Sequence, residues 1–223
     1  TSIGHFAFHE CISLRSIEIP QNVASIGDYS FCLCSLLDQI SIQSNLTSIG
    51  SHAFSRCSSL KNLVIPSSVS LIGSSAFSWC TSLTKFEIPS NLKRIEESTF
   101  FGCTSLLCVK IPSSVESIGF DAFYKCSSLV DVEIPDSVST VGKSAFNGCL
   151  SLEKVKISPC LTKIDEYTFF QCCSLKNIDI PSSVKIIGKC AFSECDSMTS
   201  VKIPSSVESI ENDSFPSETQ LIK

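Results

Sequence analysis

The sequence predicts a solenoid, a fold in which each turn of backbone stacks on the turn before it. Phenylalanine recurs every 23 residues along a chain of 223 residues, at Phe8, Phe31, Phe54, Phe77, Phe100, Phe123, Phe146, Phe169, Phe192 and Phe215. Cysteine keeps the same spacing at Cys11, Cys34, Cys57, Cys80, Cys103, Cys126, Cys149, Cys172 and Cys195. A fixed short period is typical of repeats that bury like side chains on like side chains.

The first element of each repeat is a short strand. Ile17 and Ile19 alternate with the polar residues Ser16 and Glu18, which is the two-residue period of a strand with one buried face. In most repeats a proline follows, as Pro20 does here, and its missing N–H ends the strand. We therefore expect one short strand per repeat, stacked in parallel register.

Two further segments complete the repeat. Val115 and Ile118, three residues apart, predict a second short extended or turn segment. The sequence Ala-Phe-x-x-Cys, as at residues 122–126, spaces its apolar side chains as a single helical or 3₁₀ turn would. Three short sides joined by three corners make one coil.

The corner after the second segment usually carries glycine, but Glu96, Asp165 and Glu211 replace it in three repeats. A position that required a positive φ would rarely accept glutamate. We therefore expect ordinary backbone geometry at this corner.

The nine periodic cysteines share one repeat position, so stacking places them in a single file of side chains. Free cysteine is among the most buried residue types and packs as a small hydrophobe. We interpret the file as a buried, reduced ladder, and extensive disulfides in a thiol count under denaturant would contradict this. The remaining cysteines, which fall at five different repeat positions and show no pairing logic, are Cys32, Cys108, Cys160, Cys173 and Cys190.

Composition excludes several classes of function. The net charge is −5 and only 17% of residues are charged, so no broad basic surface is available for nucleic acid. No apolar stretch approaches the roughly 18 residues that span a bilayer. The three histidines, His5, His9 and His52, match no zinc spacing, and no nucleophile–base constellation or phosphate loop stands out. We expect no metal, no cofactor and no catalysis.

The repeat pattern C-x-x-L-x-x-I-x-I-P-x-x-V-x-x-I-G-x-x-A-F resembles the 23-residue leucine-rich repeat of the BspA-like family, also called the TpLRR type. The resemblance covers residues 1–223 as a single domain of about nine and a half repeats. The cysteine-rich version looks most like the surface proteins of protists. It implies a right-handed coil with a parallel sheet on the concave face and short strands or 3₁₀ turns on the convex side.

The resemblance also implies a function. The family is associated with cell-surface or secreted proteins that adhere to protein or glycan ligands on a host or a neighbouring cell. An intracellular, cytoplasmic scaffold for protein–protein interaction is the alternative. The chain begins in mid-repeat without a polar cap, so we expect a segment of a longer protein. The sequons at Asn45 and Asn212 are compatible with secretion but are not evidence for it.

The outward strand positions are the candidate binding surface. The residues concerned are Ser41, Asn62, Val64, Lys85, Glu87, Lys110, Asp131, Glu133, Lys154, Lys156, Asn177, Asp179 and Lys202. From Glu87 to Lys202 the charge in one column alternates from repeat to repeat. Alternation favours a ladder that pairs with itself, whereas the alternative is a charged groove for a partner. The more neutral rungs at Ser41, Asn62 and Val64 would then be the better docking surface.

Overall fold

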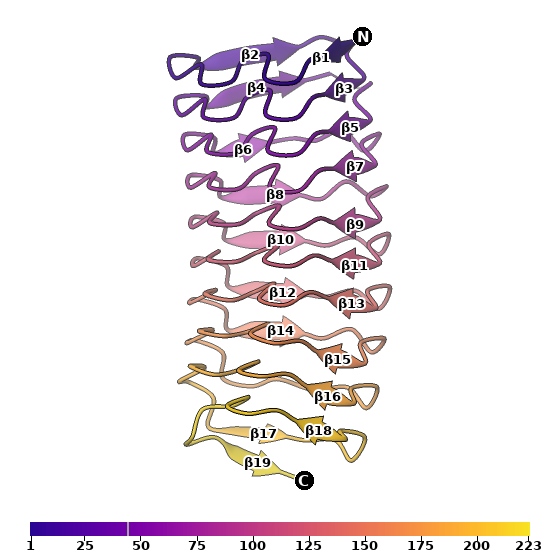
Figure 1. Cartoon of the computed structure of the whole chain (residues 1–223), viewed down its shortest axis with the longest axis vertical. Coiled ribbons are helices and arrows are strands. Elements are labelled where there is room, and N and C mark those ends of the chain that lie inside the picture. Colours follow the sequence, from indigo (N-terminus) through magenta and orange to yellow (C-terminus); the bar gives the residue numbers. More distant parts are fainter. Residues whose placement is uncertain (44) are drawn as a thin grey trace.

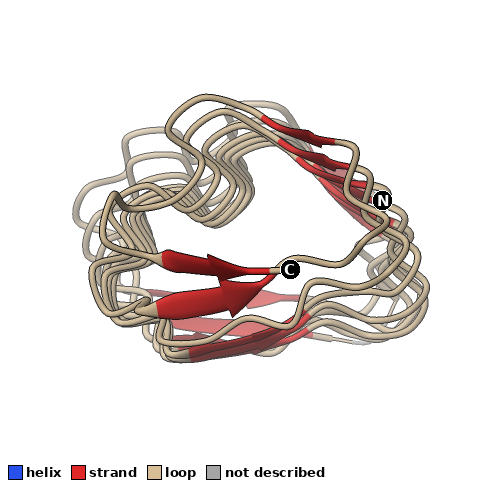
Figure 2. Cartoon of the chain, turned by 90° about the horizontal axis from the view of Figure 1, so that it is seen from below, coloured by secondary structure: helices blue, strands red, loops and turns tan. Residues whose placement is uncertain are grey.

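The computed structural model describes residues 1–43 and 45–223. The coils stack along one axis with the two ends of the chain at opposite ends of the stack (Figure 1). Viewed along the stack, each coil has three sides (Figure 2). We call them the long-strand face, the short-strand face and the turn side, the last being the segment that leads from each short strand to the next long strand.

Parallel strands in register build the first two sides, as the alternating isoleucines predicted. The long-strand face holds β2 (Ser16–Ile19), β4 (Gln39–Ile42), β6 (Asn62–Leu63), β8 (Lys85–Glu87), β10 (Cys108–Lys110), β12 (Asp131–Glu133), β14 (Lys154–Lys156), β17 (Ser200–Lys202) and β19 (Gln220–Ile222). The short-strand face holds β1 (Ser2–Ile3), β3 (Ser25–Ile26), β5 (Ser48–Ile49), β7 (Leu71–Ile72), β9 (Arg94–Ile95), β11 (Ser117–Ile118), β13 (Thr140–Val141), β15 (Lys163–Ile164), β16 (Ile186–Ile187) and β18 (Ser209–Ile210). Most coils therefore contribute to two parallel sheets, whereas the coil with residues 177–179 has no assigned long strand.

Both ladders are interrupted. On the long-strand face, β2 pairs with β4, β6 to β14 form a second sheet, and β17 pairs with β19. On the short-strand face the sheets are β1 to β7, β9 to β13, and β15 with β16 and β18. Where strands pair, the register is one repeat, as for Ile26 with Ile49. The last pair, Val201 with Leu221, is closer in sequence because the final coil is shorter.

The phenylalanine file is the centre of the core. Neighbouring rings stack with centroids 5.0 to 5.7 Å apart and interplanar angles of 1° to 10°. Phe86 adds an eleventh core ring and contacts Phe77 and Phe100. Rings so buried are worth about 1.5–3 kcal/mol each in transfer free energy, and each needs a neighbouring coil to cover it.

The cysteine ladder is confirmed as buried and free of disulfides. The ladder thiols from Cys34 to Cys195 are fully buried, and Cys11 in the first coil is half-buried. Each thiol from Cys34 to Cys195 donates to the carbonyl oxygen of the core phenylalanine 26 residues earlier, with Sγ–O distances of 3.0 to 3.4 Å. Cysteine thus packs as a hydrophobe and also satisfies a buried carbonyl, as in Cys103 to Phe77.

The expectation of a helical or 3₁₀ turn around Ala-Phe-x-x-Cys was wrong. None of the described residues is helical. From Phe8 to Phe192, the residues two before and two after each phenylalanine of the file have positive φ, between 52° and 65° where the residue is not glycine, and this breaks a helix. Their amides donate to the next coil instead, as Phe6 N does to the Asp28 carbonyl at 3.0 Å. Hydrogen bonds between coils hold this unusual backbone.

The corner glycines have ordinary φ, as the replacements by Glu96 and Asp165 predicted. Their role is a close approach of coils. A Cβ on Gly119 would lie 2.7 Å from the Glu97 amide nitrogen of the coil before. The Gly119 amide donates to the Ile95 carbonyl at 2.8 Å, but neither Glu96 nor Asp165 makes the equivalent bond. The short-strand ladder is interrupted at these two coils, between β7 and β9 and between β13 and β15.

Candidate functional site

The predicted surface residues are exposed side chains along one side of the stack. Each is exposed, and most stand on strands of the long-strand face. Val64 follows β6 directly and has 82% of its surface exposed. Asn177 and Asp179 are exposed but stand in a segment with no assigned strand. No described contact or ligand shows which of these residues bind, so their role stays a prediction.

The alternating charges lie opposite one another on paired strands only in part of the column. Lys110 stands opposite Glu87, and Lys156 opposite Glu133. Within the described residues, only Lys156 and Glu133 of this column form an ion pair, with Nζ–Oε1 at 2.5 Å. The hydrogen bond that Lys156 donates to this carboxylate raises the pKa of Lys156. The charges were interpreted as one continuous ladder that pairs with itself, but in the described part of the chain an ion pair forms at only one position of this column, between Glu133 and Lys156.

The reason lies in the backbone. Pairing of β10 with β12 is confined to Cys108 and Asp131 at their starts, so Lys110 is not a ladder partner of Glu133. Residues 177–179 belong to neither neighbouring sheet, so Asp179 has no charged partner beside it on the ladder. A depression of about 390 Å³ opens there, lined by Glu153, Lys154, Val155, Lys176, Asn177, Ile178 and Asp179.

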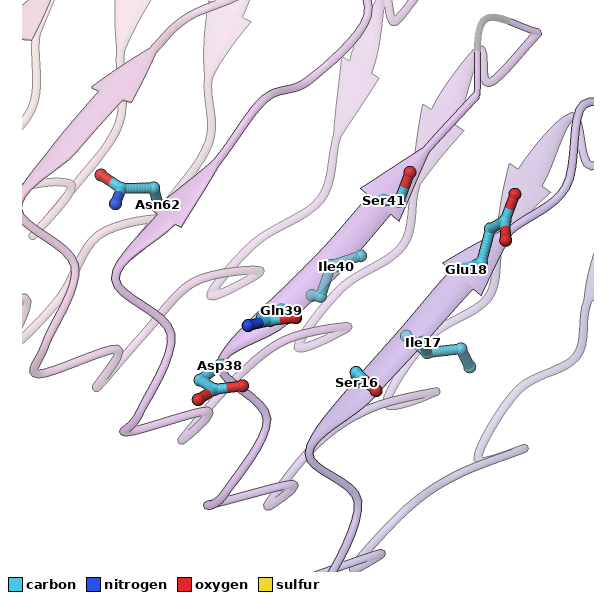
Figure 3. A pocket seen from close by; sticks show the side chains of 8 residues that line it. All are labelled: Ser16, Ile17, Glu18, Asp38, Gln39, Ile40, Ser41 and Asn62. Atoms are coloured by element: carbon cyan, nitrogen blue, oxygen red, sulfur yellow. The ribbon is translucent and has the colours of Figure 1, made fainter.

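The larger depression of this face lies at the other interruption, between β4 and β6. Its volume is about 510 Å³ and it is lined by Ser16, Ile17, Glu18, Asp38, Gln39, Ile40, Ser41 and Asn62. Figure 3 shows these side chains arising from β2, β4 and β6 and the residue before β4. Glu18 accepts a hydrogen bond from Gln43 at 2.8 Å. The side chains of Asp38, Gln39 and Asn62 make no hydrogen bond or ion pair with the described part of the chain.

This depression includes two of the three neutral rungs that the sequence singled out, Ser41 and Asn62. Asp38 is not one of the predicted surface residues, because it precedes the strand by one position. A signal was present, since Asp38 occupies a repeat position between Arg15 and Lys61 in the neighbouring coils. The lining carries two carboxylates, amides and hydroxyls without a basic side chain, so it suits a ligand that donates hydrogen bonds or carries positive charge.

Among the described residues, no group of three or more histidine, cysteine or acidic side chains is placed to hold a metal ion. No helix suited to crossing a membrane occurs between residues 1 and 43 or between 45 and 223.

Short parallel strands, a 23-residue register and a file of buried phenylalanines define a repeat protein of the solenoid class. In a comparison of the sequence with protein families, the family model described as BspA type leucine rich repeat region, with six copies, matches residues 1–126 and 94–222. The chain therefore belongs to this family. A comparison of the sequence with curated proteins gives no match.

Solved structures of similar proteins agree with this fold. A leucine-rich repeat protein from Bacteroides ovatus is 28% identical, with a TM-score of 0.55 over 100% of this chain and 78% of that one. A leucine rich cell surface protein from Faecalibacterium prausnitzii is 26% identical, with a TM-score of 0.52 over 99% and 83%. The T. pallidum leucine rich repeat protein is 24% identical, with a TM-score of 0.59 over 88% of this chain and 82% of that one. At this identity the similarity supports the fold alone.

Proposed function

We propose that residues 1–223 act as one non-catalytic module that adheres to a protein on a host or neighbouring cell, at the cell surface or after secretion. The observation that carries this proposal is the long-strand face. Its polar side chains stand exposed on a rigid stack, and the depression between β4 and β6 offers hydrogen-bonding groups that the described chain leaves unused. The similarity to a cell surface protein supports the location.

The amino-terminal part of the face is the better docking surface for two reasons. The depression there is the larger of the two, and three of its polar side chains have no partner in the described chain. Farther along, Lys156 is already paired with Glu133. A protein partner gains more from groups that do not first have to give up an internal contact.

The test is binding of the whole chain to a panel of host extracellular-matrix proteins, measured by biolayer interferometry. Asn62→Arg and Ser41→Arg fill the depression, and we expect each to weaken binding at least about tenfold, the loss typical of a well-packed contact. Thr140→Arg adds the same charge and bulk to an exposed position on the short-strand face and is the matched control.

A loss of binding with Thr140→Arg but not with Asn62→Arg would place the binding face on the short strands. No binding to any member of the panel, with all variants folded by circular dichroism, would contradict adhesion to host matrix.

A further inference from the structure

The aromatic side chains outside the core all lie on the turn side. The chain has 15 phenylalanines, three tyrosines and one tryptophan, and eleven of the phenylalanines belong to the core. The other aromatic residues are Phe6, Tyr29, Trp79, Phe101, Phe120, Tyr124, Tyr167 and Phe170, and each keeps part of its surface exposed. The long-strand face carries none of them. Aromatic residues are enriched where proteins bind partners.

Three of these aromatics form a continuous cluster over three consecutive coils. Trp79 and Phe101 have ring centroids 5.5 Å apart, and Phe101 stacks on Tyr124 at 4.7 Å. The indole of Trp79 covers Gly102, where a Cβ would lie 2.7 Å from the ring. The cluster is therefore fitted to the backbone beneath it. Phe101 and Tyr124 turn their faces to each other, so a partner meets the ring edges.

Two cations flank the cluster without a carboxylate partner. Arg56 lies one coil before Trp79, and Lys125 follows Tyr124 and stands 5.3 Å from its ring centroid. Both are exposed, and neither has an acidic group within 4 Å among the described residues. Asp121, four residues before Lys125, is attracted by Lys143 and repelled by Glu97.

The donors of the cluster are also unused. In the part of the chain that the structure describes, the indole N–H of Trp79 and the hydroxyl of Tyr124 make no hydrogen bond. The edge of an aromatic ring carries partial positive charge, as opposed to its negative face. Among the described residues, ring edges, two cations without a carboxylate partner and two donors without an acceptor together form a surface that complements carboxylates.

We propose that the turn side around Arg56, Trp79, Tyr124 and Lys125 is a second docking surface, and that it binds an acidic segment of a partner protein. The carboxylates of such a segment pair with Arg56 and Lys125, while its apolar atoms pack on the rings. This surface lies on a different side of the coil from the depression between β4 and β6, so it does not depend on the function proposed for that face (Figure 2).

The single tryptophan makes the test direct, because all tryptophan emission comes from Trp79. A short poly-glutamate peptide is titrated into the whole chain while that emission is recorded. We expect a saturable change that weakens as salt is added, because the charges at this surface are exposed. A poly-lysine peptide of the same length should produce no change.

Charge-reversal variants locate the binding. Arg56→Glu and Lys125→Glu should each weaken the affinity for poly-glutamate by at least about tenfold, since like charges then face each other. Arg94→Glu and Lys163→Glu on the short-strand face make the same change in net charge and should leave the affinity for poly-glutamate unaltered. Arg56→Gln and Lys125→Gln give smaller losses and guard against misfolding of the reversed variants.

Three outcomes would overturn the proposal. The first is equal weakening by the short-strand variants, which would indicate a general effect of net charge. The second is poly-glutamate binding with no response of Trp79 emission. The third is binding of heparin without binding of poly-glutamate, which would assign the surface to anionic glycans.

Discussion

At one repeat position, three residues after the corner, the presence of a hydroxyl group depends on which residue stands at the corner. Most coils have alanine there, but where an acid replaces the corner glycine the residue is threonine or serine. Thr99 donates to the Glu96 carbonyl at 2.7 Å, Thr168 donates to the Asp165 carbonyl at 2.8 Å, and Ser214 donates to the Glu211 carbonyl. Ser30 is the exception, because the corner residue three positions before it is glycine and its buried hydroxyl has no hydrogen-bond partner.

Substitution of Ser30 should therefore raise stability. A buried hydroxyl without a partner costs about 1–3 kcal/mol in desolvation, so we expect Ser30→Ala to unfold at a higher urea concentration. Thr99→Val at the same repeat position removes a satisfied hydroxyl and keeps the shape, so its midpoint should fall. Equal shifts of the two variants in one direction would contradict this account.

At the scale of the element, the corner controls how closely coils approach. Glycine allows the amide of each short-strand corner to reach the carbonyl of the coil before, whereas Glu96 and Asp165 lose this bond and interrupt the ladder. Glu211 keeps the bond to Ile187 at 2.9 Å. An acid at the corner therefore weakens the ladder in two coils and is accommodated in the third.

An alanine scan of two glycines tests this role. Gly119→Ala places a methyl group 2.7 Å from the backbone of the neighbouring coil, and overpacking of this kind costs about 1–3 kcal/mol. Gly4→Ala, at the same repeat position in the first coil, meets nothing within 4 Å and is the control. We expect the thermal midpoint to fall for Gly119→Ala only. A similar fall in both variants would point to backbone conformation as the cause.

The elements differ in how far the sequence could predict them. The strand at Ile17 and Ile19 and its end at Pro20 follow from a local pattern, and both were correct. The turn that follows each short strand was not predictable, because its positive-φ positions hold residues such as Phe6 and Ser75 in place of glycine. That geometry depends on hydrogen bonds to the next coil, which no local pattern contains. For the same reason the depression at Asp38 was missed, since it arises where two strands fail to pair.

Across the whole molecule, the thiol ladder couples folding to protonation. Burial raises the pKa of Cys103 to about 12 from an ordinary 9.0, and burial raises the pKa of its ladder neighbours Cys80 and Cys126 as well. In the unfolded chain these thiols ionise near 9, whereas in the fold they stay protonated. The native state therefore binds more protons than the unfolded state above this pH, and stability must fall as pH rises.

We expect the free energy of unfolding to be constant with respect to these thiols below pH 8 and to decline steadily above pH 9. Urea denaturation under reducing conditions at a series of alkaline pH values measures the slope. Cys103→Ala should make the decline shallower, while Cys108→Ala at an exposed position should not. A flat profile up to pH 11 would show that the ladder thiols are not the protonated groups assumed here.

The hydrogen bonds of the turn side give the stack a direction of assembly. Amides such as that of Phe6 donate forward to carbonyls of the following coil, while thiols such as that of Cys34 donate backward to the preceding one. A coil emerging from the ribosome can thus bond its thiol at once to a coil that is already present. Its turn amides remain open until about one further repeat has been synthesised. Growth of the native structure then follows translation, one repeat behind the growing end of the chain.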